Sequence, residues 1–265
     1  MNGPVELGPL QLGLAALLIL LNAAISMRLQ LGLGRRLLLA SLRSVVQLSL
    51  LGLLLTWVFS VQGPWAVLPL MVLMALIAGF EAVKRTTRRV PGIYGVSIGV
   101  VLATSMAITF YGLVAVIGIE PWYAPRYAVP ILGMVLGNTL TGISLGLETT
   151  LRGFDRDRAQ VELLLAHGAT RKEASREVVR GAVRTGMIPI LNAMIAAGLI
   201  SIPGMMTGQI LAGQDPASAA RYQMFILFSI AAGVALGTMG VVLLTARLVF
   251  DGRERLRPER IRRVS

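Results

Sequence analysis

The sequence predicts an all-α membrane protein that crosses the bilayer about seven times. Of its 265 residues, 55% are apolar and only 14% are charged, whereas a soluble domain usually carries about 25% charged residues. Long apolar stretches and the uneven placement of basic residues between them are the second and third observations. A soluble globule needs a polar surface that this composition cannot supply, so lipid is the expected solvent for much of the chain.

Seven apolar stretches follow one another along the chain. A hydrocarbon core of about 30 Å needs about 20 helical residues. Long runs without polar alternation favour helices, because in lipid the backbone must satisfy its own hydrogen bonds. The fourth and seventh stretches are long enough to tilt or to leave the bilayer, and the short sixth is expected to continue a cytoplasmic helix. The stretches are Leu7–Met27, Leu37–Ser60, Pro64–Val83, Ile93–Ile119, Tyr127–Leu147, Met187–Ile202 and Tyr222–Phe250.

The basic residues predict the orientation. All 25 Lys and Arg residues except Arg126 and Arg221 fall on one side, in loops or at helix ends. By the positive-inside rule, we expect a protein of the cell (inner) membrane with its N-terminus outside and its C-terminus in the cytoplasm. The basic residues that flank the first stretch follow it, so we expect a retained span and not a cleaved signal. The loops on the basic side are 28–36, 84–92, 148–186 and 251–265.

Composition also limits the function. The net charge of +12 does not indicate a nucleic-acid partner, because the basic residues are separated by membrane spans. With no cysteine and one histidine, the chain has no set of ligands for a tetrahedral metal site. We expect one membrane domain over 1–265, with a solvated basic tail at 251–265 near anionic lipid headgroups.

Residues 148–186 form the long polar segment and predict two helices joined by a glycine turn. Asp155 or Asp157 can cap the first helix, and Gly168 sits where a helix end favours positive φ. Thr170 and Glu173 match a capping box for the second helix. Val161, Leu164 and Leu165, and then Ala174, Val178 and Ala182, place apolar side chains on one face of each helix. This hairpin either lies flat on the membrane or inserts its stripe into a groove of a cytoplasmic partner.

The spacing within this segment resembles the EAA-type loop of ABC transporter permeases. Glu162 is followed by Gly168 and then by Val178 at matching intervals, although Leu163 and Leu164 replace two alanines and Gly181 stands where a proline is common. The resemblance implies that the segment is a coupling helix that docks on a cytoplasmic ABC ATPase. The partner-coupling residues would be Glu162, Leu164, Leu165, Gly168, Thr170, Glu173 and Val178.

A longer string resembles the FetB-like permease family. Residues 198–213 read GLISIPGMMTGQILAG, with Asn192 before them and Asp215–Pro216 after them; residues 43–48 and 137–139 are similar too. Bacterial members are described as iron-export permeases, and plant relatives are linked to aluminium tolerance. The resemblance covers essentially the whole chain and implies a permease homodimer in the lipid bilayer, driven by a separate ATPase.

No Walker A motif occurs in the sequence, so we expect no enzymatic activity, no catalytic residue and no cofactor on this chain. ATP and Mg would be bound by the partner subunit. The implied function is ATP-driven export of a metal ion such as iron.

Polar residues within the spans are candidates for a substrate pathway. Gln47 is too short to reach the surface and can instead form an interhelical hydrogen bond. Asn138, Thr141 and Glu148 recur at helical spacing along the fifth stretch, which predicts either polar contacts between packed helices or a pathway with Glu148 as a cation-attracting entrance. Together with Asn192 of the family string, these are the pathway candidates.

The family string also contains a predicted helix break. Pro203 and Gly204 interrupt the helix, and the string predicts either an exterior turn or a re-entrant gate, of which we favour the gate. Met205 and Met206 could suggest a soft metal, but methionine at apolar surfaces is more often a packing residue. The gate candidates are Pro203, Gly204, Met205, Met206, Thr207, Gly208 and Gln209.

Three functions compete on this reading. The first is the permease subunit of an ABC transporter, either for a metal ion or for another solute such as a nucleotide sugar. The second is a secondary transporter or channel without an ATPase, which predicts ionisable relays or inverted repeats that the spans lack. The third, an intramembrane enzyme, needs a base within the spans, and no His or acidic residue lies mid-span.

Overall fold

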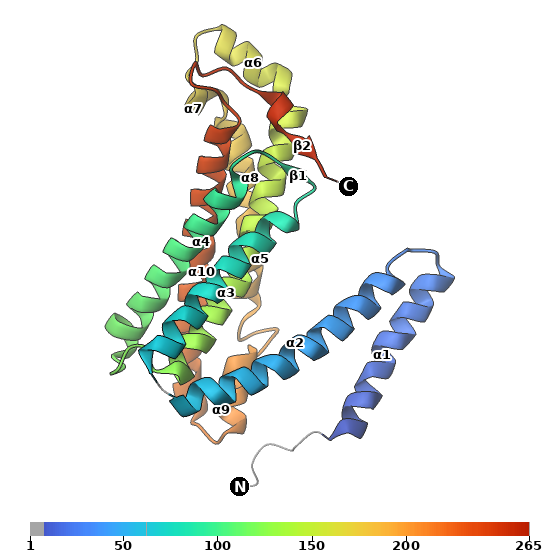
Figure 1. Ribbon diagram of the computed structural model, residues 1–265, viewed down its shortest axis with the longest axis vertical. Helices are drawn as coiled ribbons and strands as arrows, with labels where there is room; N and C mark the ends of the chain where they lie inside the picture. Colours follow the sequence, from blue (N-terminus) through green and yellow to red (C-terminus); the bar gives the residue numbers. More distant parts are fainter. Residues whose placement is uncertain (1–7, 62, 265) are drawn as a thin grey trace.

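The computed structural model describes residues 8–61 and 63–264 (Figure 1). Seven helices in this part of the chain are long and apolar enough to cross a membrane, which confirms the predicted fold class. Leu7, the expected start of the first span, lies outside the described residues. The seven helices are α1 (Pro9–Arg28), α2 (Gly34–Val61), α3 (Pro64–Lys84), α4 (Ile93–Tyr111), α5 (Pro125–Arg156), α8 (Arg176–Ala196) and α10 (Pro216–Leu248).

Shorter elements connect and extend the long helices. A π-helix, η1 (Gly112–Ile117), continues α4, and a two-stranded antiparallel ribbon pairs Arg88 with Arg263 and Arg89 with Arg262. The remaining elements are α6 (Arg158–Ala166), α7 (Arg171–Ala174), α9 (Gly204–Leu211), the 3-10 helix η2 (Pro258–Arg260), and the strands β1 (Arg88–Arg89) and β2 (Arg262–Arg263).

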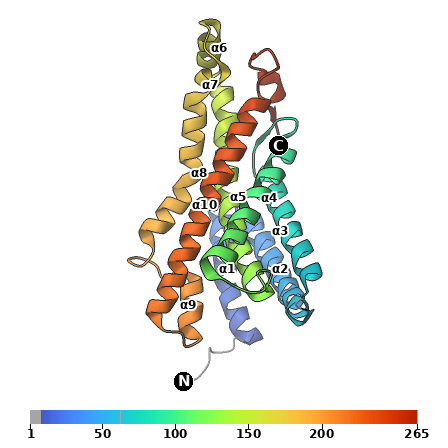
Figure 2. The ribbon, with the colours of Figure 1, turned by 90° about the vertical axis from the view of Figure 1, so that its left-hand side faces the viewer.

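Helices α3, α4, α5, α8 and α10 form a bundle with α5 at its centre (Figures 1 and 2). Small residues permit the close approach of the three central helices. A β-carbon added to Gly142 of α5 would lie 2.7 Å from a methyl of Val234 on α10 and 2.9 Å from the carbonyl oxygen of Gly186 on α8. In lipid there is no hydrophobic driving force between helices, so close van der Waals contacts of this kind hold them together.

Helices α1 and α2 pack on each other and diverge from the bundle (Figure 1). On α2 only Gly34 and Val58, one near each end, are buried. Arg43 reaches across to Glu81 of α3 at 3.4 Å. A cavity of about 660 Å³ lies between α2 and the α3–α5 face, and Gln47 and Gly137 are among its lining residues.

Two helices extend further than the apolar stretches predicted. α5 continues nine residues beyond Leu147 and carries the chain well past the end of the fifth span. α10 begins at Pro216, before the predicted Tyr222, because the Asp215 carboxylate accepts a hydrogen bond from the Ser218 backbone N–H at 2.9 Å. A short carboxylate at this position satisfies one of the free N–H groups of the first turn.

The sixth span is a broken helix. α8 ends at Ala196, an irregular segment covers 197–203, and α9 continues toward the end of the molecule opposite the hairpin (Figures 1 and 2). From Thr185 to Ala196 the uncharged part of α8 covers roughly 18 Å, and α9 adds roughly 12 Å, at 1.5 Å per residue. Because these lengths together match a hydrocarbon core of about 30 Å, we expect the irregular segment to lie at membrane depth.

The C-terminal tail is folded back on the protein, although most of its arginines remain exposed as expected for a solvated tail. β2 pairs with β1, Leu256 is buried, and the Arg260 guanidinium donates to the carbonyl oxygens of Leu248 and Phe250 at 3.1 Å each. Long-range pairing with the α3–α4 turn stabilises the tail, a contact that its local charge pattern does not reveal. Ser265 lies outside the described residues.

Candidate functional site

The predicted hairpin is present, and its turn is closed by two backbone hydrogen bonds. The Gly168 N–H donates to the carbonyl oxygen of Leu165, and the Ala169 N–H donates to that of Leu164, both at 3.0 Å, while Gly168 has φ +85°. This is the Schellman arrangement that glycine favours at a helix end. α6 therefore stops at a defined residue, and the chain reverses within a few residues.

The second helix of the hairpin begins with the predicted capping box. The Thr170 hydroxyl accepts a hydrogen bond from the Glu173 N–H, and the Glu173 carboxylate accepts one from the Thr170 N–H at 2.8 Å. The Thr170 N–H and the Thr170 hydroxyl both donate to the Glu173 carboxylate, and these two bonds, the backbone one first, lower the pKa of Glu173. After a single turn of α7, the chain continues through Ser175 into α8, so the hairpin is joined almost directly to the sixth span.

The acidic caps predicted for the first helix are only partly right. Asp155 lies inside α5 and binds Arg88 and Arg263, because α5 runs through this position without a break. Asp157 does occupy the N-cap of α6, but its side chain makes no capping hydrogen bond. Its carboxylate binds Arg156 instead, which lowers the pKa of Asp157.

Some apolar residues of the hairpin stripe are buried in the protein, and others are exposed. Val161 is buried, Leu165 packs against the core, and Val178 fills the space above Gly153 of α5. Leu164 is 38% exposed, and its neighbour Leu163 is 58% exposed. Leu163 was not among the predicted coupling residues, because the i, i+3, i+4 pattern assigns it to the polar face.

Glu162 lies on the exposed face of the hairpin, where it pairs with Arg158 at 2.8 Å. It also lines a cavity of about 410 Å³ between α6 and the C-terminal tail. The tail residue Glu254 contacts Arg171 of α7 at 3.5 Å. The tail thus touches both helices of the hairpin.

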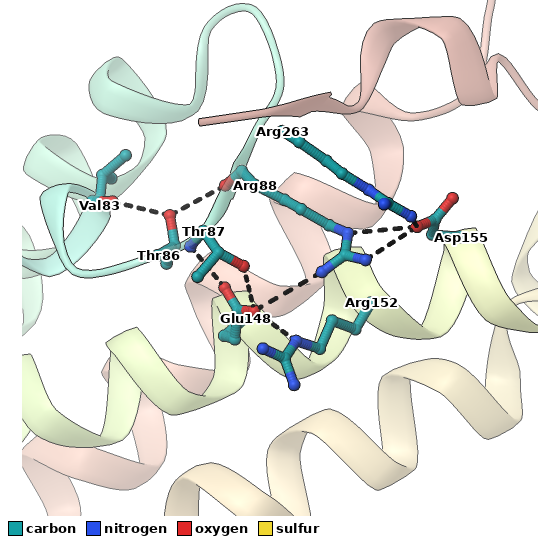
Figure 3. A network of polar contacts seen from close by, with 8 residues as sticks. All are labelled: Val83, Thr86, Thr87, Arg88, Glu148, Arg152, Asp155 and Arg263. Atoms are coloured by element: carbon teal, nitrogen blue, oxygen red, sulfur yellow. Dashed lines mark hydrogen bonds and ion pairs between the residues drawn. The ribbon is translucent and has the colours of Figure 1, made fainter. Parts of the chain in front are cut away.

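A polar network ties the base of the hairpin to the α3–α4 turn (Figure 3). The Glu148 carboxylate accepts hydrogen bonds from the Thr87 N–H at 2.7 Å, from the Thr87 hydroxyl at 2.6 Å and from Arg152. Arg88 lies between Glu148 at 3.8 Å and Asp155 at 2.9 Å. With this many partners, Glu148 has little remaining capacity to attract a cation, and its contacts favour a structural role.

The five pathway candidates do not converge on one point. Gln47 lines the α2–α5 cavity beside Gly137, whereas Asn138 and Asn192 are exposed on α5 and α8. Thr141 donates its hydroxyl to the Gly137 carbonyl at 3.3 Å. The antiparallel contact of Gly142 with Gly186 puts Asn138 and Asn192 at similar depth in the span. The Asn138 side-chain amide donates to the Met134 carbonyl at 2.9 Å, whereas the rest of its polar surface and the exposed Asn192 amide would be costly to leave in lipid.

Six of the seven gate candidates, Gly204 to Gln209, lie in the short helix α9. The choice between an exterior turn and a gate stays a prediction. Pro203 is the N-cap of α9, and the Thr207 N–H donates to the Pro203 carbonyl at 3.0 Å. The irregular backbone instead lies just before, at 197–203, where Leu199 is 92% and Ile200 is 83% exposed. Behind α9 a cavity of about 520 Å³ is lined by Met205, Gln209 and Tyr222 among others.

The candidate ligands for a metal ion are scattered over the described residues, 8–61 and 63–264. No group of three or more His, Cys, Asp or Glu side chains that could hold a metal ion occurs there. Amide and hydroxyl oxygens are the remaining candidates for contact with a cation, and they are weak ligands.

The fold and this site define a polytopic α-helical membrane protein with a rigid helical hairpin at its basic end. The chain belongs to the family described as "Uncharacterised protein family (UPF0014)", whose model matches residues 9–250. This match, together with the relatives below, confirms the family resemblance drawn from the 198–213 string.

Similar proteins come from bacteria and plants. The chain is 37% identical over 242 residues to the UPF0014 membrane protein slr1647 of Synechocystis sp., covering 89% of this chain and 92% of that protein. It is 29% identical to the "Probable iron export permease protein FetB" of Escherichia coli (92% and 93% covered). It is 31% identical to the protein ALUMINUM SENSITIVE 3 of Arabidopsis thaliana (80% and 77% covered). No solved structure matches the chain significantly.

Proposed function

We propose that this chain is the membrane permease subunit of an ATP-driven ABC transporter that exports a metal ion such as iron. It acts as a homodimer in the cell inner membrane, with the basic end in the cytoplasm as the positive-inside rule requires. ATP and Mg are bound by a separate cytoplasmic ATPase, because the chain carries no Walker A motif.

One observation carries the proposal: a rigid hairpin presents exposed leucines at the polar end of the molecule. Leu163 and Leu164 lie on α6, beyond the ends of the long apolar helices. The Schellman turn fixes the end of the helix that bears them, and the capping box fixes the start of the next helix. An exposed apolar pair on a rigid helix fits a helix-in-groove contact with a partner protein.

The connections of the hairpin support a role in transmitting force. α6 follows α5 without a linker, and α7 leads through Ser175 into α8. α8 is continuous from the hairpin to Ala196, where the break begins. Displacement of the hairpin by an ATPase would therefore move α8 and change the angle at 197–203, which identifies this segment as the hinge of the proposed gate.

The surface of the single chain supports the homodimer. An irregular backbone within the hydrocarbon region is tolerated only where protein or a water-filled cavity covers it. The 197–203 segment and the exposed amides of Asn138 and Asn192 meet this condition if a second copy packs against the α5–α8 face. The pathway then runs between the two copies.

The choice of a metal ion rests on the name of the Escherichia coli relative, "Probable iron export permease protein FetB". Gln47, Asn138, Thr141 and Asn192 offer amide and hydroxyl oxygens, which suit passage of a weakly held cation or a chelate. A transporter needs weak binding at each step, since a tight site would retain its substrate.

The test is to co-express this chain with the span-free ATPase expected to be encoded beside it. The variant Leu163→Ser with Leu164→Ser should lose co-purification of the ATPase by at least tenfold and should lose ATP-dependent transport. The matched control, Leu29→Ser with Leu31→Ser, alters two leucines at the α1–α2 turn that are 61% and 56% exposed and should retain both.

Transport is measured on vesicles that contain both subunits, with iron accumulation and nucleotide-sugar uptake assayed in parallel. Undiminished ATPase binding and transport by the Leu163/Leu164 variant would disprove coupling through the hairpin. ATP-dependent uptake of the nucleotide sugar without iron would retain the coupling and replace the substrate.

A further inference from the structure

A small groove lies at the basic end between the α7–α8 segment and α10. Its volume is about 250 Å³, and its floor is formed by apolar side chains, Val179, Leu243, Ala246 and Phe250. Five cationic residues surround this floor. They are Arg171, Lys172, Arg176, Arg180 and Arg247.

Within the described residues, three of these five cations have no carboxylate counter-ion. Among the described residues, the carboxylates within 4 Å of these cations are Glu254, 3.5 Å from Arg171, and Glu177, 3.3 Å from Arg180. Lys172, Arg176 and Arg247 make no ion pair within the described part of the chain. The groove therefore carries uncompensated positive charge, which suits an anionic ligand.

The groove lies where phospholipid headgroups are expected. From Tyr222 to Ala246 the sequence of α10 contains no charge, and this stretch covers roughly 37 Å of helix. It slightly exceeds a hydrocarbon core of about 30 Å. Arg247 is consequently the first charged residue of α10 at the membrane boundary.

An exposed apolar stripe leads from the groove into the membrane region. Leu243, Met239 and Leu236 follow Arg247 at helical spacing down α10, and Leu243 is 51% exposed. On α8 the exposed face changes in the same way, from Arg180 and Arg184 to Ile188. Both helices thus present cations at the boundary and aliphatic side chains below it.

We propose that this groove binds an anionic phospholipid, with its phosphate among Lys172, Arg176 and Arg247 and an acyl chain along the Leu243–Leu236 stripe. A soluble anion would not use the apolar floor or the stripe, and a neutral lipid would leave the unpaired cations uncompensated. Basic pockets between spans at a membrane surface are suited to such headgroups. This site does not depend on the ATPase proposed above.

The experiment measures lipid binding by the purified full-length protein, using native mass spectrometry with phosphatidylglycerol or phosphatidylcholine. The wild type should prefer phosphatidylglycerol by about tenfold or more, since each basic residue near a membrane adds roughly fivefold to anionic-lipid binding. Lys172→Gln with Arg176→Gln and Arg247→Gln should abolish most of that preference. Leu243→Trp, which fills the groove without changing charge, should weaken retention of phosphatidylglycerol severalfold.

The matched control is Arg28→Gln with Arg35→Gln and Arg36→Gln, which removes the same charge from the exposed α1–α2 turn and should keep the preference. Equal losses in the control and the groove variant would show a diffuse charge effect and overturn the proposal. Glycerol phosphate that binds as tightly as the lipid would assign the groove to a soluble anion, also against it. Complete displacement of the lipid by the partner ATPase would reassign the groove to a protein contact.

Discussion

Arg88 illustrates how charges at the basic end are used within the chain. Its guanidinium lies between Glu148 and Asp155 of α5, and Arg263 of the tail reaches the same Asp155 oxygen at 3.1 Å. Exposed ion pairs contribute little individually, but networks with hydrogen bonds contribute more. The arginines of the tail are therefore structural ligands of acidic residues as well as contributors to the positive end.

Asp251 provides a pH-dependent prediction at this scale. The backbone N–H of Arg255 donates to its carboxylate, as do the Arg253 N–H and the Arg257 guanidinium, and together they lower the pKa of Asp251. A carboxyl whose pKa is lower in the folded state stabilises the fold at neutral pH. That contribution declines as the pH falls below the unfolded value of about 3.9 and vanishes below the folded pKa.

Asp251→Asn should therefore accelerate hydrogen exchange of the Arg253 and Arg255 amides at pH 7 by roughly 2- to 10-fold. The difference between variant and wild type should shrink as the pH falls through the carboxylate range. Exchange ratios measured from pH 7 down to pH 3 check this. A ratio that stays constant over that range would show that the charge of Asp251 does not hold the tail.

Among the helices, the main stabilising feature is close packing through small residues. Gly142, Gly146 and Gly186 bring α5, α8 and α10 together, and each lacks the space for a β-carbon. The α8 helix, which joins the hairpin to the break, is held to the bundle by this contact. α1 and α2, by comparison, pack on each other and keep most of their surface exposed.

Gly142→Ala should destabilise the bundle by about 1–3 kcal/mol, because the new methyl overlaps Val234 and the Gly186 carbonyl. Gly137→Ala on the same helix is the control, since nothing lies within 4 Å of its added β-carbon. The midpoint of thermal unfolding in detergent should fall by several degrees for Gly142→Ala and stay near the wild-type value for Gly137→Ala. Equal midpoints for the two variants would mean that α8 shifts to accommodate the added methyl without loss of stability.

At the scale of the whole molecule, the surface of one chain is incomplete. The break at 197–203 exposes irregular backbone and two large aliphatic side chains at the expected membrane depth, on the side of the bundle away from α3 (Figure 2). The divergent α1–α2 hairpin leaves a second open region. Both features agree with the homodimer proposed above.

The chain contains no native cysteine, so a single introduced cysteine reports on the dimer directly. Leu199→Cys should be cross-linked to a second copy by a short bismaleimide in native membranes. Leu73→Cys, on the exposed face of α3, should remain monomeric on a denaturing gel. Cross-linking of Leu73→Cys alone would place the dimer interface on the opposite face, and equal cross-linking of both would reflect random collision.

The sequence by itself determined the features that depend on local chemistry. Seven spans follow from apolar length, and the Gly168 turn and the Thr170–Glu173 capping box follow from residues within a few positions of each other. The family followed from one uninterrupted string. Each of these is fixed by contacts along a single helix or turn, which periodicity and capping preferences report directly.

Only the tertiary structure decided where long-range partners lie. Glu148 meets Thr87 across 61 positions, and Asp155 meets Arg263 across 108; no local pattern encodes such pairs. Whether Leu163 or Leu165 faces outward depends on how α6 rests against α5 and the tail. The depth of the 197–203 break likewise depends on how far α8 extends before its helix ends, because a proline and a glycine mark that a helix stops but not how deep in the membrane it does so.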